Sequence, residues 1–329
     1  MIDDIACCPD CRGQLVELTC SSCGRSFPVS AGVVQLLPLA LAHMADLAAQ
    51  GAAGVVNAPY ATASNPTPTD DHVRWVEDEM AWWDPRYATD SPRPFSPDSG
   101  LRGRSRERNL LRPVRSRLPS VPLVIEMGAG TSLTAAGLLG PARYIATDVS
   151  ASALRAGRAV LPLDAVSVQC DAVGWPFREG VADVVMILGV LHHLSDWRAA
   201  LDRACRTVRP GGFLLLHEAV TKPRVLGRWR SRGLDDDWVS PHEGDVPRAE
   251  LLGLLRSRGV VERVHGEESP LRFALVRYLI HYGNRYALLD RSRALTMAFN
   301  GLDQAFGRTL GRAFPSLGFN EVTVVWRAS

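Results

Sequence analysis

Lysine is almost absent from this chain of 329 residues: Lys222 is the only one, and arginine supplies every other basic side chain. Acidic and basic residues nearly balance, with a formal net charge of +2, so the overall charge indicates no particular partner. Long apolar runs are missing too. The longest, from Val33 to Val56, is interrupted by polar residues and a proline. It is therefore not a membrane-spanning helix, and we expect no membrane partner.

The amino terminus lacks the apolar run of a signal peptide, because Asp3, Asp4 and several cysteines stand in its place. We therefore expect a cytoplasmic protein whose thiols stay reduced. What the chain does have is 46% hydrophobic residues, enough for one large core and a small satellite. The composition leaves the oligomeric state open.

Five of the seven cysteines lie within the first 23 residues. Four of them form two Cys-x-x-Cys pairs, Cys8 with Cys11 and Cys20 with Cys23. Four thiolates arranged in this way can bind one zinc ion tetrahedrally in a closed, structural site. Free or redox-active cysteines are the alternative, and Cys7 could exchange with Cys8 as a ligand. A disulfide framework is disfavoured in a reducing compartment.

Residues 5–38 also contain the segment GRSFPVSAGVVQLLP after the second cysteine pair. With the two pairs, this segment resembles the zinc ribbon of the small activator proteins that partner RNA and protein methyltransferases. The same ribbon is fused to many bacterial methyltransferases. The resemblance implies a structural or docking role for the ribbon, with substrate recognition as the alternative.

Changes in composition divide the chain into four parts: a zinc ribbon (1–38), a linker (39–70), amino-terminal helices (71–120) and a main domain (121–329). The linker is rich in Ala, Gly, Asn, Pro and Thr. A helix is predicted from Asp71, with Val73, Val76, Met80 and Trp83 on one face. A second helical segment, 101–118, carries seven arginines, and Pro113 should kink or end it.

In the main domain, near-continuous apolar strands alternate with helical segments, which predicts an α/β fold with a parallel sheet covered on both faces. The predicted strands are 123–127, 144–148, 166–170, 183–187, 213–218, 260–266 and 319–327. Helices are predicted at 150–161, 195–208 and 248–258, with a long helical insert at 267–318.

Functional residues are expected where these strands end. Gly128 and Gly130 follow the first strand, and glycines there let the backbone approach a ligand closely. Asp148 ends the second strand, where a carboxylate can accept hydrogen bonds from both ribose hydroxyls of a nucleoside. Asp171 follows the third. A nicotinamide-binding domain is the alternative, but Leu133 replaces the third glycine of that fingerprint and LHHLSD follows the fourth strand.

From about residue 105 to 329, these motifs resemble the class I S-adenosylmethionine-dependent methyltransferase family. The resemblance implies a Rossmann-like, seven-stranded sheet with S-adenosylmethionine as the cofactor. Gly128 and Gly130 would line the methionine and ribose, and Glu126 would lie near the methionine amino group. Asp148 would bind the ribose. The adenine would lie beside Asp171 and Ala172, and the methionine above Leu188 and Gly189. Ser132 departs from a further glycine of the family, which affects only the local turn.

Methyl transfer needs proximity and removal of the acceptor's proton, so histidines are the candidate bases. His193 is the first choice, because by resemblance the second histidine of the HH pair faces the active site. His242, in an insert after the fifth strand, is the second. Other candidates are His192, His217 with Glu218, Glu243 beside His242, and His281. The sequence shows no second metal-ligand cluster and no NPPY-type motif, which disfavours metal-dependent O-methylation and amide or adenine N-methylation.

We therefore expect an enzyme of bacterial secondary metabolism that methylates a small molecule, on oxygen in the first place, with nitrogen and carbon as alternative acceptor atoms. The insert 267–318 and the Trp82–Trp83 pair suggest a capped, partly apolar pocket for the acceptor. One alternative is an rRNA or tRNA methyltransferase that grips nucleic acid with its ribbon and arginine-rich segment. The other is a non-catalytic, cofactor-binding partner protein.

Overall fold

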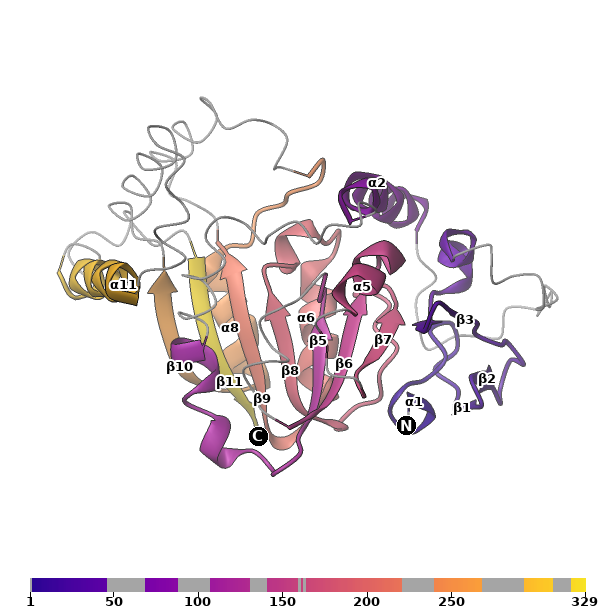
Figure 1. The fold of residues 1–329 in the computed structure, drawn as a ribbon, viewed down its shortest axis with the longest axis horizontal. Coiled ribbons are helices and arrows are strands. Elements are labelled where there is room, and N and C mark those ends of the chain that lie inside the picture. Colours follow the sequence, from indigo (N-terminus) through magenta and orange to yellow (C-terminus); the bar gives the residue numbers. More distant parts are fainter. Residues whose placement is uncertain are drawn as a thin grey trace.

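The computed structural model describes residues 2–45, 69–87, 107–130, 141–158, 161, 164–220, 240–267, 293–309 and 321–329. Their centre is a nine-stranded sheet in the order β10-β11-β9-β8-β5-β6-β7-β4-β3 (Figure 1). The seven strands of the main domain are β5 (Leu123–Met127), β6 (Arg143–Asp148), β7 (Val166–Gln169), β8 (Ala182–Leu188), β9 (Val208–Ala219), β10 (Gly259–Glu267) and β11 (Glu321–Ala328). All seven predicted strands are present, so the seven-stranded expectation is confirmed for the main domain.

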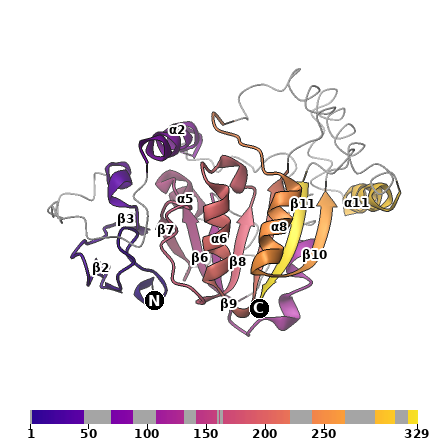
Figure 2. The ribbon, with the colours of Figure 1, turned by 180° about the vertical axis from the view of Figure 1, so that it is seen from behind.

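Strands β5 to β9 run parallel to one another, and β11 joins the sheet antiparallel to β9. The carboxyl ends of β8, β5, β6 and β7 therefore lie side by side at one edge of the sheet. This is where a parallel sheet binds its ligands. Helices α6 (Trp197–Thr207) and α8 (Arg248–Arg258) cover one face (Figure 2), and α5 (Ala151–Gly157) packs on the other.

The remaining two strands come from the predicted zinc ribbon. β3 (Val29–Ser30) pairs antiparallel with β4 (Val33–Gln35), and β4 pairs parallel with β7. Val33, Val34 and Gln35 lie opposite Ser167, Val168 and Gln169. The ribbon thus continues the sheet of the main domain, which the sequence did not indicate. The short β1 (Leu15–Val16) and β2 (Thr19–Cys20) form a separate hairpin.

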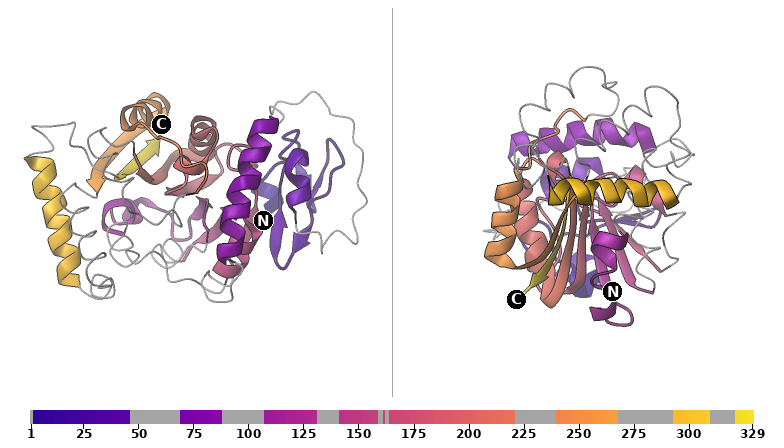
Figure 3. Two further views of the ribbon diagram at one scale, coloured as in Figure 1. Left: turned by 90° about the horizontal axis from the view of Figure 1, so that it is seen from above. Right: turned by 90° about the vertical axis from the view of Figure 1, so that its left-hand side faces the viewer.

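Helix α2 (Asp70–Tyr87) begins where the predicted helix begins and lies across the carboxyl ends of the strands (Figures 1 and 3). It rests partly on the 3₁₀ helix η1 (Leu39–Met44), because Val76 packs with Leu37 and Leu41. η1 occupies the start of the predicted linker, and residues 46–68 lie outside the described ranges.

The described part of the arginine-rich segment is less helical than predicted, although its break at Pro113 agrees with the prediction. Its described part has only a π-helical turn, η3 (Glu107–Leu111), and a 3₁₀ turn, η4 (Arg115–Arg117). Pro113 lies between them, and a proline both lacks the amide donor and clashes with the preceding turn. The insert 267–318 contains the helix α11 (Arg293–Arg308), in agreement with its helical period. Within the described ranges, no helix has the length and apolar character needed to cross a bilayer.

Candidate active site and metal centre

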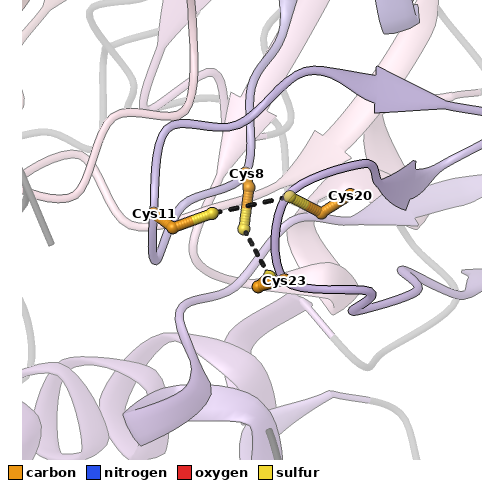
Figure 4. A group of neighbouring side chains, drawn as sticks. All are labelled: Cys8, Cys11, Cys20 and Cys23. Carbon is orange, nitrogen blue, oxygen red and sulfur yellow. Dashed lines mark hydrogen bonds between the residues drawn. The ribbon is translucent and has the colours of Figure 1, made fainter. Parts of the chain in front are cut away.

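The four cysteines of the two pairs converge at one point of the ribbon (Figure 4). The sulfur atoms of Cys8 and Cys23 lie 3.8 Å apart, and those of Cys11 and Cys20 lie 3.5 Å apart. A tetrahedral zinc with bonds of about 2.3 Å requires sulfur atoms about 3.8 Å apart. The ligand set fits zinc. Cys7 is buried outside this group, and its amide donates to the carbonyl of Pro176 over 2.8 Å.

The ribbon is fixed to the main domain by backbone and arginine hydrogen bonds. The guanidinium of Arg12 donates to the carbonyls of Trp175 and Phe177, each over 2.7 Å. The amide of Leu36 donates to the carbonyl of Gln169 over 2.8 Å, at the end of β7. Buried side chains from both the ribbon and the sheet, such as Leu36 and Val168, belong to one hydrophobic cluster. These contacts hold the ribbon against the strands that end at the cofactor site.

The turn after β5 requires glycine. Gly128 has a φ of +65° and Gly130 a φ of +55°, a left-handed region that other residues rarely adopt. A Cβ atom on Gly128 would lie 2.5 Å from a methyl carbon of Val190. The backbone therefore passes close to the end of β8, where Leu188 ends the strand and Gly189 follows with a φ of +76°. Glu126, the preceding acid of the motif, is buried.

Asp148 ends β6 beside this turn. One carboxylate oxygen accepts a hydrogen bond from the amide of Gly130 and the other from the amide of Ser150, each over 2.8 Å. A carboxylate oxygen has two acceptor positions, so each oxygen can still accept from a ribose hydroxyl. Burial raises the pKa of Asp148 to about 6, and the carboxylate of Asp84 contributes to the rise. The hydroxyl of Ser150 also hydrogen-bonds Asp84 on α2.

Asp171, after β7, is already engaged within the protein. Its oxygens accept from the amides of Val173 and Gly174 over 3.0 and 2.9 Å, and one lies 3.0 Å from Nε2 of His72. The other ring nitrogen of His72 lies 2.6 Å from the hydroxyl of Ser195. Asp171 therefore fixes a turn and a helix at this edge of the sheet. Its predicted place beside the adenine, with the half-buried Ala172, stays a prediction.

The two adjacent histidines lie on the 3₁₀ turn η5 (Leu191–His193) that follows β8. Nδ1 of His192 hydrogen-bonds the fully buried Glu218, which also accepts from the amides of Val190 and Leu191. Nδ1 of His193 lies 2.9 Å from the hydroxyl of Ser240. Burial lowers the pKa of His193 to about 3, with a smaller effect of His192. His193 is therefore neutral at every physiological pH, but its pKa lies well below the near-neutral value expected of a base.

The second candidate base, His242, lies on the same side of the sheet. Its ring stacks on Trp75 with centroids 4.2 Å apart, and its Nε2 lies 2.8 Å from Asp78. Its neighbour Glu243 comes together with His192 and His193, with one potential ligand atom of each within 4.8 Å of the others. The structure thus contains a second group able to bind a cation, which the sequence pattern did not reveal.

Of the other two candidate histidines, the structure describes His217. His217 is buried on β9, with Nε2 3.4 Å from Glu321 of β11. His281 lies outside the described residues. Among the described residues, the His217 side chain therefore has no contact that places it with His193.

Helix α2 supplies three residues that sequence reasoning missed, His72, Trp75 and Glu79, and it places Trp83 of the predicted Trp82–Trp83 pair beside His193. Trp75 donates from its indole nitrogen to the carbonyl of His193 over 2.8 Å. His72 contacts Asp171, and a carboxylate oxygen of Glu79 lies 3.5 Å from Nδ1 of His193. The Trp83 ring lies edge-on to His193, with centroids 5.6 Å apart. The only available signal was the apolar face of the helix, which predicted burial but not its location.

Comparison with known proteins agrees with this geometry. The family model described as "Methyltransferase domain" matches residues 125–216, which span β5 to most of β9. The chain contains a methyltransferase domain. A second model, described as "Trm112p-like protein", matches residues 4–32, so the methyltransferase domain is preceded by a Trm112p-like zinc ribbon.

Two curated relatives each align with about a third of the chain. A demethylmenaquinone methyltransferase of Mycolicibacterium vanbaalenii is 36% identical over 104 residues, covering 31% of this chain and 44% of that protein. A tRNA (carboxymethyluridine(34)-5-O)-methyltransferase of Arabidopsis thaliana is 29% identical over 136 residues, covering 38% of this chain and 32% of that protein. The chain thus spans less than half the length of either relative.

Among solved structures, the geranyl diphosphate C-methyltransferase of Streptomyces coelicolor superposes with a TM-score of 0.50 at 15% identity, covering 80% of this chain and 100% of that chain. This likeness establishes the Rossmann-like methyltransferase fold. S-adenosylmethionine is the cofactor of this fold, and the turn at Gly128 and the free acceptor positions of Asp148 suit it. The ribbon adds a structural zinc.

Proposed function

We propose that the protein is a cytoplasmic, S-adenosylmethionine-dependent methyltransferase that methylates a small molecule on oxygen. The observation that carries this proposal is the enclosure of His193 at the carboxyl end of the sheet. Side chains from η5, from α2 and from Ser240 contact it there. The strand ends that suit the cofactor lie beside this group, so an acceptor at His193 would be next to the transferred methyl group.

The contacts of the three histidines support a small, uncharged acceptor. His192 contacts the carboxylate of Glu218, His193 that of Glu79, and His242 that of Asp78. Aromatic rings complete the surroundings, with Trp83 edge-on to His193. A phosphate backbone is poorly suited to such acidic surroundings, because like charges repel across a partly desolvated site.

Bound S-adenosylmethionine supplies a methyl group on a positively charged sulfur, which leaves as the neutral thioether. In the chemistry we propose, Asp148, Gly128 and Gly130 hold the cofactor, with Glu126, Leu188 and the Asp171–Ala172 pair beside it. His193 accepts the acceptor's hydroxyl proton as the oxygen bonds to the methyl carbon. His242 takes this role if His193 only orients the acceptor.

Incubation with methyl-labelled S-adenosylmethionine tests the proposal. Small-molecule extract and total RNA of the source organism are supplied separately, with Asp148→Ala as the inactive control. We expect a metabolite in which one labelled methyl group has replaced a hydrogen, and no label in RNA. Label in RNA would instead support the tRNA or rRNA alternative, which the Arabidopsis relative makes worth testing. Cofactor binding without label in either fraction would support a non-catalytic partner protein.

A further inference from the structure

Glu79 has an environment unlike that of the other acids on α2. The side chain of Glu79 is only 5% exposed, whereas the other acidic residues of α2 are partly or fully exposed. Its neighbours Glu77 and Asp78 are more exposed and contact His43 and His242. A glutamate in the middle of a helix has no capping role to explain its burial. Its location must therefore be explained by what its two oxygens contact.

One oxygen of Glu79 is used within the protein. Oε2 accepts a hydrogen bond from the indole nitrogen of Trp83 over 3.0 Å, and it lies 3.5 Å from Nδ1 of His193. The same Nδ1 lies 2.9 Å from the hydroxyl of Ser240. If Nδ1 of His193 carries the proton, it faces two acceptors, the hydroxyl oxygen of Ser240 and Oε2 of Glu79. The lone pair of His193 is then on Nε2.

The other oxygen of Glu79 has no hydrogen-bond partner among the described residues. Oε1 of Glu79 is buried and makes no hydrogen bond to any part of the chain that the structure describes. An unsatisfied buried acceptor costs about 1–3 kcal/mol and more if it is charged, so native proteins rarely retain one without a reason. A hydrogen-bond donor on a bound ligand would supply the missing partner.

We propose that Glu79 is part of the acceptor site, an inference that rests on the proposed function. Through Oε2 it acts as a positioning residue that holds the proton of His193 on Nδ1. Nε2 is then the atom that takes the acceptor's proton. Through Oε1 it accepts a hydrogen bond from a second donor on the acceptor, such as a hydroxyl beside the one that is methylated.

The charges around Glu79 define the class of acceptor further. Glu218 is buried behind His192, and Glu243 has a carboxylate oxygen within 4.8 Å of a nitrogen of each histidine. A carboxylate or phosphate next to the reacting atom would be repelled by these groups. The site therefore takes a neutral acceptor with two adjacent donors, and an ortho-diol such as catechol is a suitable probe.

Nitrogen NMR of the full-length protein tests the positioning role. The chain is labelled with ¹⁵N-histidine and saturated with S-adenosylhomocysteine, and the His193 signals are identified from their loss in His193→Ala. We expect the Nδ1–H tautomer in the wild type. Glu79→Gln should shift the His193 population toward the Nε2–H tautomer. Glu79→Asp, which keeps the charge, should retain more of the Nδ1–H tautomer than Glu79→Gln does. The exposed control Asp71→Asn should leave the tautomer populations unchanged. An Nε2–H tautomer in the wild type, or an unchanged one in Glu79→Gln, would overturn the positioning role.

Titration with catechol and with benzoate tests the binding role in the same samples. We expect catechol to shift the His193 signals in the wild type. Its affinity should fall about tenfold in Glu79→Gln, because a neutral amide replaces the charged acceptor of the hydrogen bond. Benzoate should bind more weakly than catechol. No response to catechol, equal affinity in Glu79→Gln, or preference for benzoate would each refute it. Calorimetry with S-adenosylhomocysteine distinguishes failure of the Glu79 proposal from failure of the proposed function. A wild-type protein that does not bind S-adenosylhomocysteine contradicts the proposed function itself.

Discussion

The pKa of Asp148 predicts how cofactor affinity depends on pH. Burial raises this pKa to about 6, so the free protein carries a proton on Asp148 in mildly acidic solution. Ribose hydroxyls donate to the charged carboxylate, and cofactor binding must therefore release that proton. The sign follows: affinity rises as the pH rises through 6 and becomes constant above about 7.

The size of the effect follows from the same pKa. At pH 5, one unit below the value of about 6, releasing the proton costs about 1.4 kcal/mol, or about tenfold in affinity. At pH 7.5 this cost is negligible. Asp148→Ala removes two hydrogen bonds to a charged group, and partial compensation by water leaves an expected loss of about 2–4 kcal/mol at pH 7.5.

Calorimetry with S-adenosylhomocysteine at pH values from 5 to 8 measures both effects. Asp148→Asn keeps the shape of the side chain but cannot ionise, so its affinity should be low and independent of pH between 5 and 7. Asp164→Asn, at an exposed position of the same domain, should follow the wild type. An affinity that does not change between pH 5 and 7 in the wild type would refute the reasoning. So would the same slope in Asp148→Asn.

Four further predictions concern the metal, the candidate base and the turn. Metal analysis should find one zinc per chain, and Cys23→Ser should lower it below about half an equivalent. A second equivalent in the wild type would indicate a metal near the histidine pair. His193→Ala should lower kcat by about 10²–10⁴-fold with cofactor affinity retained, whereas His192→Ala should mainly lower stability in urea. Because the pKa of His193 falls from 6.5 to about 3, stability should drop by about 2 kcal/mol from pH 7 to pH 5, and His193→Ala should lose this dependence. Gly128→Ala should destabilise by about 1–3 kcal/mol in urea unfolding, since its φ is positive and Val190 is in the way; an unchanged midpoint would contradict the close approach.

The strands and the positions of their terminal residues could be predicted because the signal is local. Apolar runs of five to seven residues mark buried parallel strands, and residues directly after them must lie at one edge of the sheet. Asp148 was placed in this way, and the structure puts it beside Gly130. The cysteine pairs are equally local, because the spacing within each pair allows both thiolates to reach one ion.

The contacts of α2 could not be predicted in the same way. His72 reaches Asp171 and Glu79 reaches His193 across more than 90 positions of sequence, and a helical period shows which face is buried but not what covers it. The arginine-rich segment was predictable only in part. Its break at Pro113 agrees with the prediction, but the described residues on either side of the proline form short turns and not a longer helix.

The pairing of β4 with β7 means that the ribbon covers one edge of the methyltransferase sheet. Without residues 1–38, the backbone amide and carbonyl groups of β7 that pair with Val33, Val34 and Gln35 would face solvent. Such an exposed strand is a template for pairing with another chain, and two of the four residues of β7 are valines. A shortened chain that begins after residue 38 should therefore aggregate, even though every strand of the methyltransferase domain is retained. Zinc would then influence solubility through a strand that it does not touch.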